Sequence, residues 1–396
     1  MAVIEVAELD PKKRVLLVST HPVQTTGYSK VSLNLLKHLG KREDLEIVQY
    51  GFQNFNSMDS EDRLKQIPSN VLVYDAAKAL SKPDVIVIFN DSMIVSKFLI
   101  ELKKEPRILS DKVRIVVYLD QVYPTQRVDL LSIIVESAHH IITFTDYWKQ
   151  ELLKQNVRVP MTALMHGFDD ETFKPLDLPK PRESTMLVLN LNRNQPRKRL
   201  DIMAMAMAQV FIKRPDANVT FVIGSDARTG AWDVPFIFQV ELSRVFPQDQ
   251  VQYYMNKVLT PNNGGKMTDS EVNELYNQTD VGINTCCGEG VGLNQLEHAG
   301  VGKPQIAPAL GGLTDFLNAK NSILIEPKYR LWAVNAVEVM GGEQRLVDPS
   351  DVSDAILKYH DDPKLREKHG AQARKDMLNL KWADVASELY DLLLSL

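Results

Sequence analysis

The sequence predicts an α/β protein built from two Rossmann-like, doubly wound domains that face a central cleft. Its 396 residues are two to three times the length of a typical single domain. Short hydrophobic runs rich in β-branched residues alternate with amphipathic segments along nearly the whole chain, which is typical of parallel sheets covered by helices on both faces. A proline-rich stretch near the middle separates two halves of similar size.

The expected strands are continuous hydrophobic runs rather than alternating ones. They are residues 14–20, 45–50, 84–89, 114–119, 140–145, 186–192, 218–224, 280–286, 303–308 and 322–327. The amphipathic segment 28–39, which follows the first run, is an expected helix. Sheets of this kind bind ligands at the carboxyl ends of their strands, so two facing domains supply the two walls of one cleft.

Residues 173–184 carry three prolines, Pro175, Pro179 and Pro181, and no apolar period. Because proline forbids regular helix and most sheet positions, we expect a stiff, extended linker here. The expected division is a first domain over residues 1–175, a second over 176–378 and a C-terminal helix over 379–396. That helix has an apolar stripe that must pack somewhere, and packing back on the first domain is one option.

The composition excludes several kinds of protein. With 46 Lys and Arg against 51 Asp and Glu, the net charge is -5, so we expect no nucleic-acid partner, which would usually require a basic protein. The neighbouring Cys286 and Cys287 argue against a disulfide framework and a zinc site. Neither a signal peptide nor a run of roughly 18 apolar residues is present. We therefore expect a cytoplasmic protein and leave peripheral membrane contact and a homodimer open.

The most informative stretch runs from Cys286 to Pro304. It follows a hydrophobic run and places Gly288, Gly290 and Gly292 in a tight turn before an expected helix. The free N–H groups and the positive end of that helix suit a phosphate. The spacing is G-x-G-x-G rather than G-x-G-x-x-G, which disfavours a dinucleotide site.

Two acids flank this turn, Glu289 before the helix and Glu297 within it. Eight helical residues rise about 12 Å. That separation exceeds the roughly 5–9.5 Å between the paired carboxylates of a glycosidase, so the two acids serve different parts of one elongated ligand. Either acid considered alone is more simply explained as a solvated surface carboxylate.

A second stretch, residues 189–201, contains a strand, a turn with Pro196 and the start of a helix. Arg193 and Lys198 straddle the turn, whereas helical geometry directs Arg197 and Arg199 elsewhere. Two cations at the carboxyl end of a strand can neutralise a diphosphate. An exposed, solvated basic turn explains this stretch alone, but the glycine-rich turn later in the same half favours an anion site.

Together these motifs resemble a known family. The pattern E-G-x-G-L-x-x-x-E from Glu289 to Glu297 resembles the E-x7-E motif of retaining GT-B glycosyltransferases of family 4, also called group 1. Residues 268–293, 302–316 and 166–175 are similar to further segments of that family, and Arg193 with Lys198 matches its diphosphate-binding pair. The resemblance is strongest from 161 to 316. The segment 192–201 is also similar to virus-encoded members.

The resemblance implies a GT-B fold and transfer of a sugar from a nucleotide diphosphate sugar to an acceptor hydroxyl with retained anomeric configuration. Arg193 and Lys198 would hold the diphosphate. Backbone contacts to phosphate and sugar would come from Gly290, Val291, Gly292 and Leu293. Glu289 would contact sugar hydroxyls and Glu297 the ribose. Gly27 resembles the family's glycine in the loop after the first strand, although a plain strand-to-helix turn explains it nearly as well.

One position departs from the family pattern. Many relatives carry a histidine at the end of a first-domain strand where this chain has Asp120. We expect Asp120 to hydrogen-bond a sugar or acceptor hydroxyl or to balance developing positive charge, with a helix or turn cap as the equal alternative. His21 and His166 are the nearest substitutes for the histidine. Asn90 and Asp91, which end another strand, are also expected to face the cleft.

The expected activity is therefore that of a metal-independent hexosyltransferase without a cofactor, since the cations neutralise the diphosphate. Family tendencies favour GDP-mannose over UDP-glucose as donor, and the acceptor is an unidentified glycan, lipid or protein. Two alternatives stay open. One is a nucleotide-sugar epimerase on the same scaffold, and the other is a non-catalytic subunit that binds nucleotide sugars.

Overall fold

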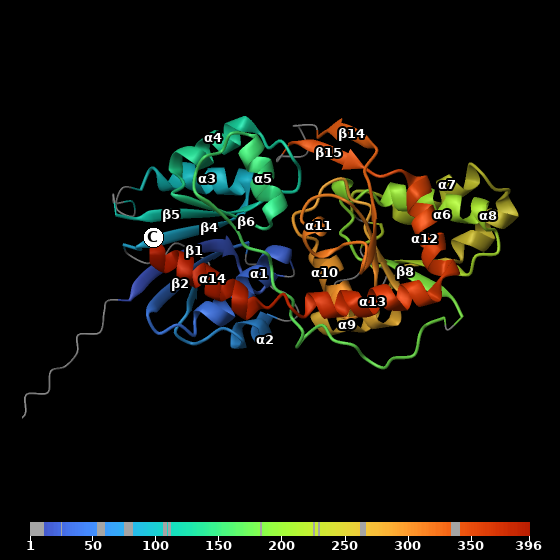
Figure 1. Cartoon of the computed structure of the whole chain (residues 1–396), viewed down its shortest axis with the longest axis horizontal. Coiled ribbons are helices and arrows are strands. Elements are labelled where there is room, and N and C mark those ends of the chain that lie inside the picture. Colours follow the sequence, from blue (N-terminus) through green and yellow to red (C-terminus); the bar gives the residue numbers. More distant parts are fainter. Residues whose placement is uncertain are drawn as a thin grey trace, which may run out of the picture.

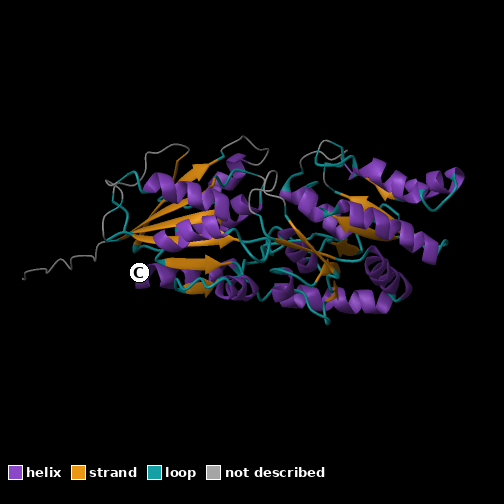
Figure 2. Ribbon diagram, turned by 90° about the horizontal axis from the view of Figure 1, so that it is seen from above, coloured by secondary structure: helices purple, strands orange, loops and turns teal. Residues whose placement is uncertain are grey.

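The computed structural model contains two parallel-sheet α/β domains that lie side by side (Figure 1). The structure describes residues 12–24, 26–53, 60–74, 82–105, 109, 112–182, 184–224, 226–228, 230–261, 267–333 and 341–396. Viewed from above, helices cover both faces of each sheet (Figure 2). The fold class expected from the sequence is confirmed.

The first domain is built on a sheet that has seven parallel strands within the described ranges, in the order β3-β2-β1-β4-β5-β6-β7. The strands are β1 (Lys13–Thr20), β2 (Leu45–Phe52), β3 (Leu72–Tyr74), β4 (Val85–Asp91), β5 (Arg114–Asp120), β6 (His140–Thr143) and β7 (Met161–Ala163). The helices are α1 (Gly27–Leu39), α2 (Ser60–Lys65), α3 (Ser92–Leu102), α4 (Val128–Ser137) and α5 (Asp146–Lys154).

The second domain has a sheet of six parallel strands in the part of the chain that is described, in the order β10-β9-β8-β11-β12-β13. The strands are β8 (Met186–Asn190), β9 (Val219–Ile223), β10 (Val258–Leu259), β11 (Val281–Ile283), β12 (Gln305–Pro308) and β13 (Ser322–Ile325). The helical elements are the 3₁₀ turn η1 (Pro196–Lys198), α6 (Leu200–Lys213), α7 (Val234–Ser243), α8 (Gln248–Met255), α9 (Asp269–Gln278), α10 (Leu293–Gly300), α11 (Leu313–Phe316), α12 (Pro349–Asp361) and α13 (Pro363–Met377).

Each expected strand corresponds to a strand of one of these sheets, whereas the strands that were not expected are short and lie at sheet edges or outside the sheets. The antiparallel pair of β14 (Tyr329–Trp332) and β15 (Glu343–Leu346) is such a case, and β14 is exposed along its whole length. Its side chains Tyr329, Leu331 and Trp332 are hydrophobic but exposed, so β14 contributes nothing to a buried core.

The linker has no helix or strand among residues 174–182, as its prolines require. Its backbone is nevertheless anchored to α9: the amide of Lys174 donates to Asn273 Oδ1 at 3.1 Å, and the amide of Leu176 donates to Asn277 Oδ1 at 2.8 Å. Lys180 also pairs with Asp280. These contacts fix the path of the chain as it enters the second domain.

The last helix, α14 (Trp382–Ser395), leaves the second domain and packs against α1 of the first (Figure 1). Its buried residues are Trp382, Val385, Ala386, Leu389 and Leu393. They join a hydrophobic cluster that includes side chains of both domains, such as Trp148 and Leu313. The apolar stripe of this helix is thus buried against the first domain.

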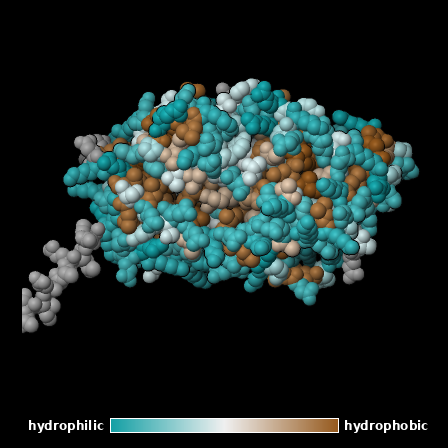
Figure 3. Space-filling view, viewed as in Figure 1, coloured by the Kyte–Doolittle hydropathy of each residue, from teal (hydrophilic) through white to brown (hydrophobic). Residues whose placement is uncertain are grey.

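The surface seen in the view of Figure 1 is mostly hydrophilic, with scattered hydrophobic areas (Figure 3). Among the helices that the structure describes, none is long and apolar enough to cross a membrane.

Candidate functional site

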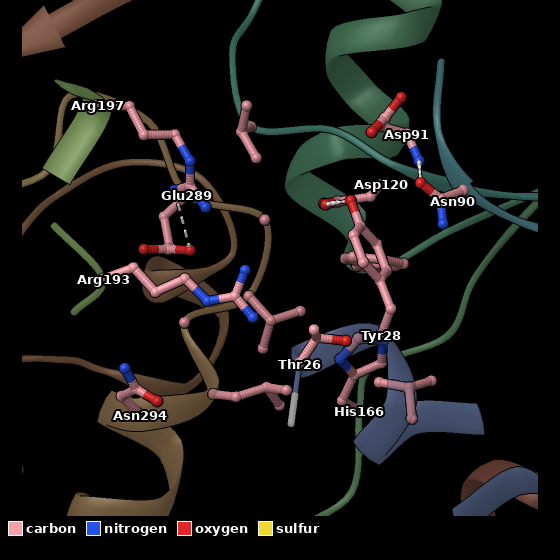
Figure 4. Close-up of a pocket in the computed structure, with 18 of the residues that line it drawn as sticks. Thr26, Tyr28, Asn90, Asp91, Asp120, His166, Arg193, Arg197, Glu289 and Asn294 are labelled. Atoms are coloured by element: carbon pink, nitrogen blue, oxygen red, sulfur yellow. Dashed lines mark hydrogen bonds and ion pairs between the residues drawn. The ribbon is translucent and has the colours of Figure 1, made fainter. Parts of the chain in front are cut away.

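A cavity of about 410 Å³ lies between the two domains. The first domain lines it with the start of α1 and the carboxyl ends of β4 and β5, and the second domain lines it with η1 and the loop before α10 (Figure 4). The expected site residues that line it are Gly27, Asp120, Arg193, Lys198, Glu289, Gly290, Val291, Gly292 and Leu293. Asn90, Asp91 and His166 line it as well, whereas Glu297 does not.

The wall formed by the second domain carries three cations, because Arg197 lines the cavity together with Arg193 and Lys198. The expectation that Arg197 points elsewhere was wrong. It assumed α-helical spacing, but residues 196–198 form a 3₁₀ turn, and Arg199 then has a left-handed φ of 49° that separates this turn from α6. Arg199 pairs with Asp201 at 2.6 Å instead.

Glu289 is the anion that holds two of these cations. The ammonium of Lys198 donates a hydrogen bond to Glu289 Oε2, and Arg197 Nη1 lies 3.4 Å from Oε1 and donates to the carbonyl of Gly288 at 2.9 Å. Burial alone would raise the pKa of Glu289, but the charges of Lys198 and Arg197 lower it to about 2. The carboxyl is therefore ionised at neutral pH.

The glycine-rich turn brings its backbone against the first domain. A Cβ at Gly288 would lie 2.3 Å from the carbonyl oxygen of Val122, and a Cβ at Gly290 would lie 2.3 Å from Asp120 Oδ1. Gly292 has a φ of 90° and precedes α10, whose first turn has no side-chain cap. Uncapped N–H groups at a helix N-terminus are suited to bind an anion.

Asp120 ends β5 on the opposite wall. Tyr28 Oη donates a hydrogen bond to Asp120 Oδ2 at 2.5 Å, while the buried Oδ1 has no hydrogen-bond partner among the described residues. Burial raises the pKa of Asp120 to about 6; the hydrogen bond from Tyr28 and the charge of Arg197 act in the opposite direction. None of the described helices is capped by Asp120, so the helix-cap alternative is not supported, whereas Asp91 caps α3 by accepting from the amide of Ile94 at 3.0 Å.

Of the two histidines, only His166 lines the cavity. It is fully buried and stacks on Trp382 at a ring separation of 5.7 Å, and burial lowers its pKa to about 3. His166 is therefore neutral at physiological pH. His21 lies against Gly51 in the first domain, where its Nδ1 accepts from the amide of Val23 at 3.3 Å.

Glu297 is buried next to this cavity rather than in it. Its Oε1 accepts from the ammonium of Lys30 at 2.6 Å, and its Oε2 accepts from Tyr276 Oη at 3.0 Å. It lines a smaller cavity of about 50 Å³, and Leu293 lines both cavities. The ribose contact expected for Glu297 stays a prediction.

Sequence analysis missed Tyr28, Lys30 and Arg197. Tyr28 follows Gly27 at the start of the helix after the first strand, and this position could have predicted that it lines the cavity. Lys30 belongs to the same helix, but its partner lies 267 residues away, and no local pattern reports such a contact.

Comparison with known proteins identifies the family. Residues 134–389 match the sequence model of a family described as "Family 4 Glycosyltransferase in conflict systems", which is well over half of the chain. The chain belongs to this family. It is a glycosyltransferase, and the resemblance expected from the motifs is confirmed. Among curated proteins, none matches this sequence significantly.

Solved structures agree with this glycosyltransferase in fold. Anabaena Alr3699/HepE in complex with UDP and glucose has a TM-score of 0.69 at 15% identity, over 96% of this chain and 99% of that one. Sucrose-phosphate synthase from Thermosynechococcus elongatus has a TM-score of 0.66 at 16% identity, over 97% and 100%. An E. coli protein bound with UDP-2-fluoro glucose, described as "Trehalose-6-phosphate", has a TM-score of 0.66 at 12% identity, over 96% and 98%. These similarities establish the GT-B fold.

Proposed function

We propose that this glycosyltransferase moves a hexose from a nucleotide diphosphate sugar to an acceptor hydroxyl and retains the anomeric configuration. One observation carries the proposal: Arg193 and Lys198 line the same cavity as the glycine-rich start of α10. Cations and free backbone N–H groups that converge on one space suit a diphosphate.

The second-domain wall would stabilise the leaving group. As the bond from C1 of the sugar to the phosphate oxygen breaks, negative charge accumulates on the diphosphate, where Arg193, Arg197 and Lys198 can bind it. The ammonium of Lys198 has three protons and donates one of them to Glu289, so the other two can donate to a phosphate oxygen. We propose that these cations do the work of a divalent metal ion in neutralising the diphosphate.

Retention follows if the acceptor attacks from the face that the diphosphate leaves. The acceptor oxygen bonds to C1 while the C1–O bond breaks, the electron pair of that bond passes to the diphosphate, and the acceptor proton passes to a phosphate oxygen. Glu289 is ionised and held by Lys198 and Arg197, so we assign it to sugar hydroxyls and to the positive charge that develops on the sugar. Asp120 would accept from a sugar or acceptor hydroxyl on the other side.

The preference for GDP-mannose came from family tendencies alone and has no further support. HepE, which has the same fold, was solved in complex with UDP-glucose, so UDP-sugars are the first donors to test.

Substitution of the cations tests the proposal. Arg193→Ala or Lys198→Ala should each lose about 2–4 kcal/mol of transition-state stabilisation, because each removes one charge from the diphosphate site. Arg199→Ala is the matched control, since Arg199 belongs to the same basic run but pairs with Asp201. Transfer rates near wild type for both Arg193→Ala and Lys198→Ala would refute the assignment, and a changed sugar nucleotide without acceptor would indicate an epimerase.

A further inference from the structure

The charges that line the cavity are divided unequally between its two walls. The second-domain wall supplies all three cations among the described lining residues, together with Glu289. The first-domain wall supplies two carboxylates, Asp91 and Asp120, and neither Lys nor Arg lines the cavity from the described part of this domain (Figure 4). His166, which also lines this wall, is neutral at physiological pH because burial lowers its pKa to about 3. Among the described residues, a negatively charged ligand therefore finds its counter-charges only on the second-domain wall.

The cations of the second-domain wall are already committed. Lys198 and Arg197 pair with Glu289, and the proposed function assigns their remaining hydrogen-bonding capacity, together with that of Arg193, to the diphosphate of the donor. The described lining residues include three cations and three carboxylates, so these charges balance before the donor binds. The donor adds a negative charge on each of its phosphates, which leaves the occupied cavity with an excess of negative charge. Because like charges repel more strongly where water is excluded, a second anion would bind poorly.

The first-domain wall presents hydrogen-bond acceptors that need donors. Asp120 accepts from Tyr28 with one oxygen, whereas its buried Oδ1 has no partner among the described residues, and a buried acceptor without a partner is costly. A hydroxyl group of a bound molecule can donate to such an oxygen, but an ionised phosphate or carboxylate group offers only further acceptors. Gln53 and Asn90 line the same cavity from the first domain, and their amide groups suit hydroxyl groups as well.

We propose that the part of the acceptor that enters the cavity is an uncharged polyol, and that Asp91 and Asp120 exclude phosphorylated and carboxylated acceptors. This inference rests on the proposed function, in which the donor diphosphate occupies the second-domain wall. The two carboxylates act in two ways, because their oxygens accept hydrogen bonds from hydroxyl groups and their charge repels an anion. The first-domain wall thereby selects the class of acceptor, whichever sugar is transferred.

Matched pairs of acceptors test this inference. Release of nucleoside diphosphate would be measured from UDP-glucose, GDP-mannose and ADP-glucose, at a pH above the pKa of about 6 that Asp120 has. The pairs are glucose with glucose-6-phosphate, mannose with mannose-6-phosphate, and glycerol with glycerol-3-phosphate. An uncharged member should speed the release, with a kcat/KM at least about tenfold above that of its phosphate, since bringing like charges together costs at least that factor.

Variants at the two ends of β4 test the role of the wall. Asp91→Asn removes one negative charge but keeps the oxygen that accepts from the amide of Ile94 at the start of α3, so the preference for the uncharged acceptor should fall about fivefold or more. Asp84→Asn is the matched control: Asp84 directly precedes β4, accepts from the amide of Arg14 at 2.8 Å and does not line the cavity, so the preference should stay as in wild type. Met93→Lys adds a cation to the first-domain wall and should also reduce the preference, which provides a second variant should Asp91→Asn not fold.

The outcomes bear on two separate proposals. If a phosphorylated acceptor is used as well as its uncharged counterpart, or if no uncharged acceptor speeds the release, this inference is wrong. An unchanged preference in both Asp91→Asn and Met93→Lys also overturns it, because the first-domain wall would then not select the acceptor. Calorimetric titration with UDP, GDP and ADP distinguishes the other case, since failure of wild type to bind any of these nucleotides refutes the proposed function instead.

Discussion

Single carboxylates around the cavity differ in charge state because their neighbours differ. Lys198 and Arg197 outweigh the burial of Glu289 and lower its pKa to about 2. For Asp120 burial prevails and raises the pKa to about 6. The second-domain wall is therefore ionised over the whole physiological range, whereas the opposite wall titrates just below neutral pH.

The hydroxyl of Tyr28 should set the pH at which Asp120 ionises. Its hydrogen bond favours the ionised form and so lowers the pKa, and Tyr28→Phe removes that bond but keeps a ring against Phe89 at 5.4 Å. The pKa of Asp120 should rise above about 6, and activity that needs its carboxylate should be lost at a higher pH on acidification. The measurement is the pH profile of kcat/KM.

Three charged groups face Asp120, namely Arg197, Asp91 and Glu289, and all of them remain in Tyr28→Phe. Tyr118→Phe is the control: its hydroxyl is also buried, but it donates to the carbonyl of Leu164 at 3.1 Å. An acid limb at the same pH in Tyr28→Phe and wild type would contradict the prediction.

The site could be predicted from the sequence where a residue's place follows from the end of a strand. Arg193 and Glu289 were placed at the cavity in this way, because the carboxyl ends of parallel strands meet at one edge of a sheet, whereas the family resemblance pointed to Asp120. Arg197 was missed because it lies in a 3₁₀ turn where α-helical spacing fails. The contact between Lys30 and Glu297 depends on how the two domains dock, which a local pattern does not contain.

At the level of elements, burial explains which strands the sequence reveals. The central strands β4, β5, β8 and β9 are buried almost throughout and read as continuous apolar runs. The edge strands β3, β7 and β10 consist of two or three partly exposed residues each and lack that pattern. The turn before α10 is recognisable for another reason, since only glycine permits its close approach to the first domain.

Adding a methyl group to this turn should disturb the cavity. In Gly290→Ala the new Cβ would meet Asp120 Oδ1 at 2.3 Å, so either the turn or Asp120 must move. We expect the transfer rate to fall about 10²-fold, the size of effect that a displacement of about 1 Å can produce. Steady-state kinetics with a saturating donor measures it.

Gly27→Ala gives the contrast. Its Cβ would lie 3.4 Å from Leu293 Cδ1, an ordinary contact, and the residue begins α1 without a positive φ. Alanine there should raise the free energy of unfolding by about 0.4–1 kcal/mol, because it restricts the unfolded chain. A Gly290→Ala variant as active as wild type would show that the turn does not need its glycine.

In the whole molecule, the two domains are joined by more than their linker. Trp148 of the first domain donates to the carbonyl of Gly290 at 2.7 Å, and one hydrophobic cluster runs through both domains. The chain then returns to the first domain through α14. Helix α14, which is the last element of the chain, therefore stabilises the first domain.

That arrangement predicts which part of the molecule a destabilising substitution in α14 should affect. Leu389→Ala removes a side chain that is 2% exposed and should lower the free energy of unfolding by about 2–5 kcal/mol, whereas Leu394→Ala on the same helix, at 43% exposure, should change it by less than about 0.5 kcal/mol. Amide hydrogen exchange locates the effect. Protection should fall in α1, against which α14 packs, and persist in β8, β9 and β11 of the second domain. Loss confined to the second domain would mean that α14 stabilises the domain it leaves rather than the one it reaches.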